Sequence, residues 1–266
     1  MSEGIQLGPI LLRWHSFFIV FGIAVGALLS AYETKRRGHD PEIIYYLFLP
    51  LLIWGTIGAR LWHVLTPPLS AVQLGLTTKF YFSNPFDMIA FWVGGFGIPG
   101  AVLGGTLGLL LFSRSNQLPF WHLTDLLAPG LLLAQIIGRF GDFFNQEIYG
   151  PPSNLPWAIF IDSTHRLNGY ENIDVYHPLF AYEMILNVFG LILLLWLSHS
   201  RTHKLPSGGL FLVYIMFYSL IRFLLEFLRL DPAIVGGVNA NQVFFVVTFL
   251  ISGILLYLKT QREVYL

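Results

Sequence analysis

Several long apolar stretches recur along the 266-residue chain, and they restrict the folds that it can adopt. A stretch of about 20 apolar residues has the length that a helix needs to cross a bilayer. Only 11% of the residues are charged and 55% are hydrophobic, whereas soluble domains carry about 25% charged residues. We therefore expect an all-α integral membrane protein with about seven transmembrane helices, forming a single polytopic membrane domain over residues 1–266. The predicted spans cover residues 10–31, 43–65, 88–112, 123–144, 178–197, 210–230 and 242–258.

The basic residues between the predicted spans fall mainly on one side of the membrane. The loops on this side carry Lys35, Arg36, Arg37, Arg114, Arg201, Lys204, Lys259 and Arg262. The opposite loops carry Lys79 and Arg166. Cytoplasmic loops of membrane proteins are enriched in Lys and Arg, so we expect an outside N-terminus and a cytoplasmic C-terminus. Residues 145–177, between spans four and five, are then a small external cap.

Other arginines lie within the predicted spans or at their edges, where an unpaired charge is costly. They are Arg13, Arg60, Arg139, Arg222 and Arg229. Arg13 and Arg229 either snorkel to the interface or face inward. Because arginine offers planar, bidentate donors that stay charged, inward-facing arginines suit an anionic ligand such as a phosphate.

Span six has a polar face. Its members recur at intervals of four, four and three residues, which places them on one side of a helix: Tyr218, Arg222, Glu226 and Arg229. One interpretation is an ion pair between Arg222 and Glu226 that locks two helices together. The other is that this face lines a cavity, with Arg229 and the Tyr218 hydroxyl directed toward a ligand.

A glycine-rich run, GGFGIPGAVLGGTLG, covers residues 94–108. Gly100, Gly104 and Gly108 recur every four residues, which favours close packing of two helices. The first half of the run, from Gly94 to Pro99, should break the helix and expose backbone groups to a cavity. The run is not a phosphate-binding P-loop, since no Gly-Lys-Ser/Thr follows it.

Residues 138–150, GRFGDFFNQEIYG, place an arginine, two carboxylates and two amide side chains at the end of an apolar segment. With one change they follow the signature of the prolipoprotein diacylglyceryl transferase family, Gly-Arg-x-Gly-Asn-Phe-x-Asn-x-Glu-x-x-Gly. Further similarities occur in family order: GARLWHVL around Arg60, the glycine-rich third span, HPLFAYE from His177 to Glu183, and YSLIRFLLEFLRLD over residues 218–231. The chain resembles this family over about residues 10–260, and the family's seven helices and outside N-terminus agree with the predicted spans.

The resemblance implies a multi-pass enzyme of the bacterial inner membrane that catalyses the first step of lipoprotein maturation. Such an enzyme transfers the diacylglyceryl group of phosphatidylglycerol to the lipobox cysteine thiol of a preprolipoprotein and releases glycerol 1-phosphate. This chain has no cysteine, so the thiol must come from the substrate. The expected partners are phosphatidylglycerol, the preprolipoprotein signal peptide and membrane lipid, with no nucleic acid and a monomeric state. We expect no cofactor, and no metal because the histidines show no paired metal-ligand spacing.

The same resemblance implies roles for individual residues. Arg139 and Arg222 stabilise the charge that grows on the departing phosphate in the transition state. Glu147 and Tyr218 organise these two arginines. The other residues expected to bind or support the substrate are Arg60, Arg229, Asn145, Gly95 and Gly150.

Three positions depart from the family pattern. Pro99 stands where the family usually has a histidine that is a proposed base for the thiol, His15 replaces a common tyrosine, and Asp142 replaces the asparagine of the signature. A free thiol has a pKa near 8.5, so its activation needs a proton acceptor or nearby positive charge. We hypothesise that His15 or Asp142 takes the proton. Alternatively, His15 is a hydrogen-bonded interior histidine, and Asp142 simply pairs with Arg139.

Two other function classes stay open. The missing histidine would suit a divergent, non-catalytic homologue that binds anionic lipid or lipoprotein precursors. The buried arginines alone would suit a small anion transporter or channel. Transporters often contain repeated halves with paired broken helices, and the sequence shows no internal repeat, which disfavours this last class.

Overall fold

The computed structural model describes residues 4–7, 10–200 and 205–264. Within these ranges seven helices are long and apolar enough to cross a membrane. They are α1 (Trp14–Arg36), α2 (Glu42–Leu65), α6 (Ile98–Ser115), α7 (Phe120–Asn145), α8 (Leu179–His199), α9 (Gly209–Glu226) and α10 (Ala240–Val264). The prediction of an all-α membrane protein with about seven spans is confirmed. The predicted orientation stays a prediction, and two of its basic residues, Arg201 and Lys204, lie outside the described residues.

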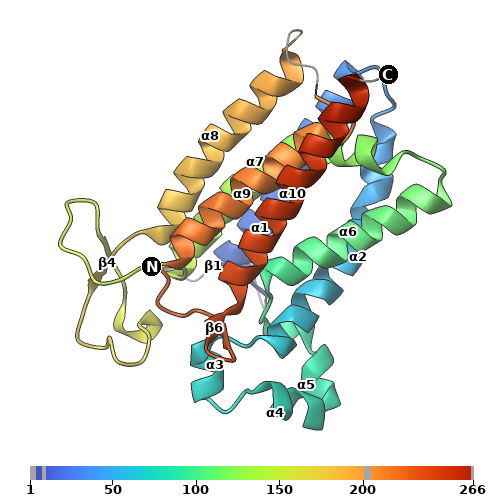
Figure 1. Cartoon of the computed structure of the whole chain (residues 1–266). Helices are drawn as coiled ribbons and strands as arrows, with labels where there is room; N and C mark the ends of the chain where they lie inside the picture. Colours follow the sequence, from blue (N-terminus) through green and yellow to red (C-terminus); the bar gives the residue numbers. More distant parts are fainter. Residues whose placement is uncertain (1–3, 8–9, 201–204, 265–266) are drawn as a thin grey trace.

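Short elements gather at one end of the helix bundle (Figure 1). Their bounds are β1 (Gly4–Leu7), β2 (Ile10–Arg13), α3 (Leu69–Gln73), α4 (Thr78–Ser83), α5 (Pro85–Ile89), η1 (Phe91–Val93), β3 (Ile159–Phe160), η2 (Ser163–His165), β4 (Val175–Tyr176), β5 (Ile234–Val235) and β6 (Val238–Asn239). The strands form three antiparallel pairs, β1–β2, β3–β4 and β5–β6. The last turn of α10 lies at the opposite end of the bundle.

Several predicted helix boundaries were wrong: α1 ends at Arg36 rather than at residue 31, and α10 ends at Val264 rather than at residue 258. Residues 10–13 form β2, so the first span begins at Trp14 rather than at residue 10. The third span begins at Ile98 rather than at residue 88, because Gly94 and Gly95 have positive φ angles of 91° and 76° that no helix continues. The sixth span ends at Glu226 rather than at residue 230.

Glycines set the packing of α2 against α6. A Cβ atom on Gly100 would lie 2.1 Å from the carbonyl oxygen of Gly58, and one on Gly104 would lie 2.0 Å from that of Trp54. A Cβ atom on Gly108 would meet the Pro50 carbonyl oxygen at 2.8 Å. Such close approach is possible only without a side chain, so the predicted packing role of Gly100, Gly104 and Gly108 is confirmed.

The segment after α7 forms a small unit with its own apolar core. Tyr149, Ile161 and Tyr176 are buried together there. Two hydrogen bonds tie this unit to its first residue, Gln146, which directly follows α7: the Gln146 side chain donates to Asp162 Oδ2 at 2.5 Å and accepts from the Asp162 backbone N–H at 2.6 Å. We call residues 146–177 the cap. This attachment fixes where the cap lies relative to residues 138–145 at the end of that helix.

Candidate active site

One carboxylate joins three transmembrane helices. Glu183 of α8 has 0% of its surface exposed and accepts hydrogen bonds from Arg139 Nη2 of α7 at 2.5 Å and from Arg222 Nη1 of α9 at 2.7 Å. The Tyr218 hydroxyl of α9 donates to the same carboxylate at 3.2 Å. A buried charge is tolerated when it is paired and hydrogen-bonded. Here one partner comes from α7 and two come from successive turns of α9. Glu183 therefore holds the two arginines side by side.

Each arginine has a second acidic partner. Arg139 Nη1 donates to Asp142 Oδ2 at 2.6 Å, one turn along α7. Arg222 Nη2 lies 3.5 Å from Glu226 Oε2 on its own helix. The Asn241 side chain of α10 donates to Glu226 Oε1 at 3.0 Å. The ion pair expected within span six is thus present, but the contact that locks neighbouring helices runs through Glu183, which the sequence analysis left without a role.

The outermost cation of span six is less enclosed. Arg229 lies beyond the end of α9, where its Nη1 is 3.9 Å from Glu226 Oε2 and its Nε donates to the carbonyl of Asp231 at 3.0 Å. Burial lowers the pKa of Arg229 from its usual value, although the guanidinium stays charged near neutral pH. Three residues of the polar face predicted for span six therefore lie in one buried network: Tyr218, Arg222 and Glu226. The fourth, Arg229, lies at the edge of this network.

Both central arginines keep one donor free. Arg139 Nε and Arg222 Nε are shielded from solvent and have no hydrogen-bond partner among the described residues. A buried donor without a partner costs free energy, typically about 1–3 kcal/mol. An anion that accepts from these atoms would remove that cost. Each of the two buried guanidinium groups thus has one N–H that is not yet hydrogen-bonded within the described residues.

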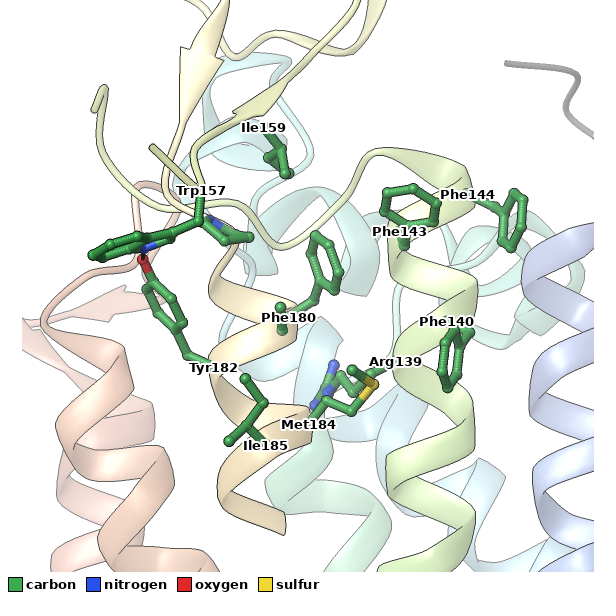
Figure 2. A pocket seen from close by; sticks show the side chains of 12 residues that line it. Arg139, Phe140, Phe143, Phe144, Trp157, Ile159, Phe180, Tyr182, Met184 and Ile185 are labelled. Carbon is green, nitrogen blue, oxygen red and sulfur yellow. Dashed lines mark hydrogen bonds between the residues drawn. The ribbon is translucent and has the colours of Figure 1, made fainter. Parts of the chain in front are cut away.

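An apolar cavity of about 700 Å³ opens beside Arg139. Figure 2 shows Arg139 at its inner end and aromatic side chains of α7 and α8 along its walls. Trp157 from the cap donates a hydrogen bond to the Tyr182 hydroxyl at 2.8 Å at the other end. The volume is within the usual range for small-molecule sites. An apolar space with a guanidinium at its end suits an amphiphile that has a negatively charged group.

Arg60 has a different environment from the one that the sequence suggested. Its guanidinium donates to the backbone carbonyls of Asp87 at 2.6 Å, Met88 at 3.1 Å and Gly94 at 2.5 Å. A Cβ atom on Gly95 would lie 2.7 Å from Arg60 Nη1. The irregular segment before α6 therefore wraps around Arg60, which satisfies its backbone carbonyls at membrane depth.

The outer end of α7 brings together His15, Asp142 and Glu147. His15 Nδ1 lies 3.8 Å from Asp142 Oδ1, and one ligand atom from each of the three side chains lies within 4.8 Å of the others. Glu147 is exposed, and its carboxylate accepts from the Asn145 amide at 3.1 Å. Glu147 thus lies beside His15 and Asp142, and the arginine-organising contacts that the sequence analysis assigned to it belong to Glu183.

Gly150 and Pro99 lie in tightly packed parts of the backbone. The Gly150 backbone N–H donates to the His177 carbonyl at 2.9 Å, and a Cβ atom there would lie 3.1 Å from His177 Cβ. Pro99 is buried in the first turn of α6. The sequence analysis gave no role to Glu183, the carboxylate that both arginines contact. Its position inside the predicted fifth span could have revealed it, because two arginines in other spans each needed an acidic partner.

Comparisons with known proteins agree with the resemblance seen in the sequence. A family profile described as prolipoprotein diacylglyceryl transferase matches residues 3–258. The phosphatidylglycerol–prolipoprotein diacylglyceryl transferase of Trichormus variabilis is 38% identical over 242 residues, covering 90% of this chain and 82% of that protein. The enzyme of the same name from Synechococcus elongatus is 36% identical over 246 residues, covering 91% and 82%. That from Thermosynechococcus vestitus is 38% identical over 239 residues, covering 90% and 85%.

Proposed function

Because the chain belongs to the prolipoprotein diacylglyceryl transferase family, we propose that it performs the reaction for which its relatives are named. It transfers the diacylglyceryl group of phosphatidylglycerol to the cysteine thiol of a prolipoprotein, the first step of lipoprotein maturation. The observation that carries this function at the level of the site is the pair of buried arginines joined by Glu183, one of which, Arg139, lines an apolar cavity. The substrate has the matching chemistry, two acyl chains and one phosphate.

The phosphate is assigned to Arg139 and Arg222. The carbon–oxygen bond that breaks leaves its electron pair on the phosphate, so negative charge grows there during the reaction. Arg139 Nε and Arg222 Nε are the buried donors that such a group can use. Donors that are already in place before the reaction stabilise this charge without further reorganisation. Glu183 and Tyr218 hold both guanidinium groups in position.

The thiol is assigned to the outer side of Arg139. His15 Nδ1 is buried without a hydrogen-bond partner among the described residues and faces Asp142 at 3.8 Å. A neutral imidazole nitrogen that has no hydrogen-bond partner can accept a proton. Asp142 would then stabilise the imidazolium, while its other oxygen stays on Arg139. This arrangement supplies the proton acceptor that Pro99 cannot provide.

The remaining predicted residues have supporting roles in this proposal. Arg60 and Gly95 hold the irregular segment before α6 in place. Arg229 adds positive charge beyond the network, Asn145 orients Glu147, and Gly150 lets the cap approach the start of α8. We further propose that the chain acts as a monomer in the bacterial inner membrane and recognises the lipobox within a signal peptide.

An adduct assay on the purified protein tests the function. The chain in detergent is supplied with phosphatidylglycerol and a peptide that contains a lipobox cysteine. The expected result is release of glycerol phosphate together with a diacylglyceryl mass increase on the cysteine, and neither product with a serine-containing peptide. Binding of lipid and peptide with no adduct over hours would instead identify a non-catalytic homologue.

A further inference from the structure

His15, Asp142 and Glu147 form a cluster of metal-ligand type at the outer end of α7. Their candidate ligand atoms, an imidazole nitrogen and two carboxylate oxygens, all lie within 4.8 Å of one another. His15 comes from the first turn of α1, whereas the two carboxylates come from α7 and from the residues directly after it. No two of these three residues have the short helical spacing from which a metal site is predicted in a sequence.

The distances within the cluster are close to those of a bound ion. Tetrahedral zinc has metal–nitrogen and metal–oxygen distances of about 2.0–2.2 Å, which separates neighbouring ligand atoms by roughly 3.4 Å. His15 Nδ1 and Asp142 Oδ1 are 3.8 Å apart. Glu147 is exposed, and its carboxylate accepts a hydrogen bond from Asn145, so it can rotate toward the other two ligands. Binding would need shifts of about an ångström or less in side chains, with no change in the helices.

Two observations distinguish this cluster from an ordinary group of surface acids. Asp142 is only 4% exposed, and Arg139 occupies its Oδ2, which leaves Oδ1 directed toward His15. His15 Nδ1 is shielded from solvent and has no hydrogen-bond partner among the described residues. Gly141 makes the approach possible, because a Cβ atom there would lie 3.1 Å from His15 Cα. The arginine behind Asp142 is the kind of outer contact that orients a metal-binding carboxylate.

The charges around the cluster also favour a cation. In the connected network Arg139 is shared by two carboxylates, Asp142 and Glu183, and Glu183 is shared with Arg222. Glu147 adds a further negative charge on the outer side, and among the described residues no arginine forms an ion pair with it. The inner end of the network is therefore closely balanced, and the excess negative charge lies at the outer end. A divalent ion bound there would neutralise Asp142 and Glu147.

We propose that His15, Asp142 and Glu147 bind a divalent metal ion of the zinc type, whose fourth ligand is the substrate's cysteine thiol. This inference rests on the proposed transferase function. Three protein ligands with one open position are typical of catalytic zinc sites. A thiol that coordinates such an ion loses its proton. In the metal-bound protein the ion, in place of a free His15 imidazole, activates the thiol. It is held through His15 and Asp142, two of the three positions where this chain departs from the family pattern.

The chemical step balances without an added reactant. The thiol proton passes to solvent water at the exposed side of Glu147 when sulfur binds the ion. The sulfur lone pair then forms a bond to the terminal glycerol carbon of the diacylglyceryl group. The bond between that carbon and the phosphate oxygen breaks, and its electron pair leaves with glycerol phosphate beside Arg139. The site thus places the nucleophile on one side of Arg139 and the leaving group on the other.

The test is metal binding by the full chain in detergent after treatment with a chelator. Titration with Zn²⁺ against a chromophoric competitor should give one bound ion per chain. This stoichiometric binding should be lost in His15→Phe and in Glu147→Gln, and the second variant alters an exposed side chain that the fold does not need. His165→Phe changes an exposed histidine of the cap and should bind like the wild type. With Co²⁺ as the probe, addition of the lipobox peptide should produce a thiolate-to-metal charge-transfer band, and the serine peptide should not.

The outcomes separate this inference from the proposed function. Adduct formation that falls on chelation and returns with Zn²⁺ supports the metal site. Full adduct formation in the chelated chain, with no stoichiometric Zn²⁺ binding, overturns the metal site and leaves the transferase function standing. Equal Zn²⁺ binding by the wild type, His15→Phe and Glu147→Gln overturns it as well. If Zn²⁺ and the thiol bind as described but no adduct ever forms, the metal site stands and the transferase function fails.

Discussion

Substitution of Glu183 by glutamine should destabilise the helix bundle more than any other single loss of a carboxylate oxygen. The change keeps the shape of the side chain but removes its charge. In the wild type the two carboxylate oxygens accept from Arg139 at 2.5 Å and from Arg222 at 2.7 Å, whereas the glutamine directs an N–H donor at one of these guanidinium groups. Removal of one partner from a buried ion pair typically costs about 3–5 kcal/mol. For a chain of this size each kcal/mol lowers the melting temperature by roughly 2–4 °C, so we expect a fall of roughly 6–20 °C.

Thermal unfolding of the detergent-solubilised protein measures this effect, and Glu147→Gln is the matched control. Glu147 is exposed, and a surface substitution usually changes stability by less than about 0.5 kcal/mol, which is roughly 1–2 °C. The comparison uses metal-free protein, so that both variants differ from the wild type only in a carboxylate. Equal melting temperatures for the two variants would refute the conclusion that Glu183 joins the three helices through its charge.

Three further predictions concern other parts of the structure. Gly104→Ala should lower stability by about 1–3 kcal/mol, because its Cβ would meet a carbonyl of α2 at 2.0 Å, whereas Gly105→Ala has open space and should be neutral or slightly stabilising in thermal unfolding. The Gln146 hydrogen bond lowers the pKa of Asp162. The stabilisation that this hydrogen bond gives is fully present above the ordinary Asp pKa of about 4, and it is lost as the pH falls through the lower pKa of the folded protein. Hydrogen exchange of the cap should therefore accelerate on acidification, and Gln146→Ala should weaken this pH dependence. Arg222→Lys keeps the charge but loses the guanidinium geometry, and the rate of adduct formation should fall about 10²-fold with no comparable loss of thermal stability.

The spans were predictable because their length and hydropathy follow directly from the thickness of the bilayer. The start of the third span was not. Gly94 and Gly95 bend the backbone so that its carbonyls reach Arg60, and that contact depends on how α2 packs beside this segment. The sequence analysis expected an anionic partner for Arg60, whereas the structure supplies backbone carbonyls. Local composition carries no information about a partner of this kind.

The charged residues of the site were predictable as a set, but their pairing was not. The helical spacing of Tyr218, Arg222 and Glu226 places them on one face, and the structure confirms that they share one buried network. Glu183 belongs to another helix, so the spacing within α9 cannot reveal it as the common partner. The contact between His15 and Asp142 likewise depends on the close approach of α1 to α7 at Gly141.

The most direct test of the central claim is adduct formation in variants of the two bridged arginines. Arg139→Ala and Arg222→Ala should each retain less than about 1% of the wild-type rate, because each removes a preorganised donor to the departing phosphate. Arg114→Ala changes an exposed arginine at the end of α6 and should retain the wild-type rate. Melting temperatures of all variants separate a loss of chemistry from a loss of folding. Near wild-type rates in folded Arg139→Ala and Arg222→Ala would contradict the assignment of the phosphate to the arginine pair that Glu183 holds.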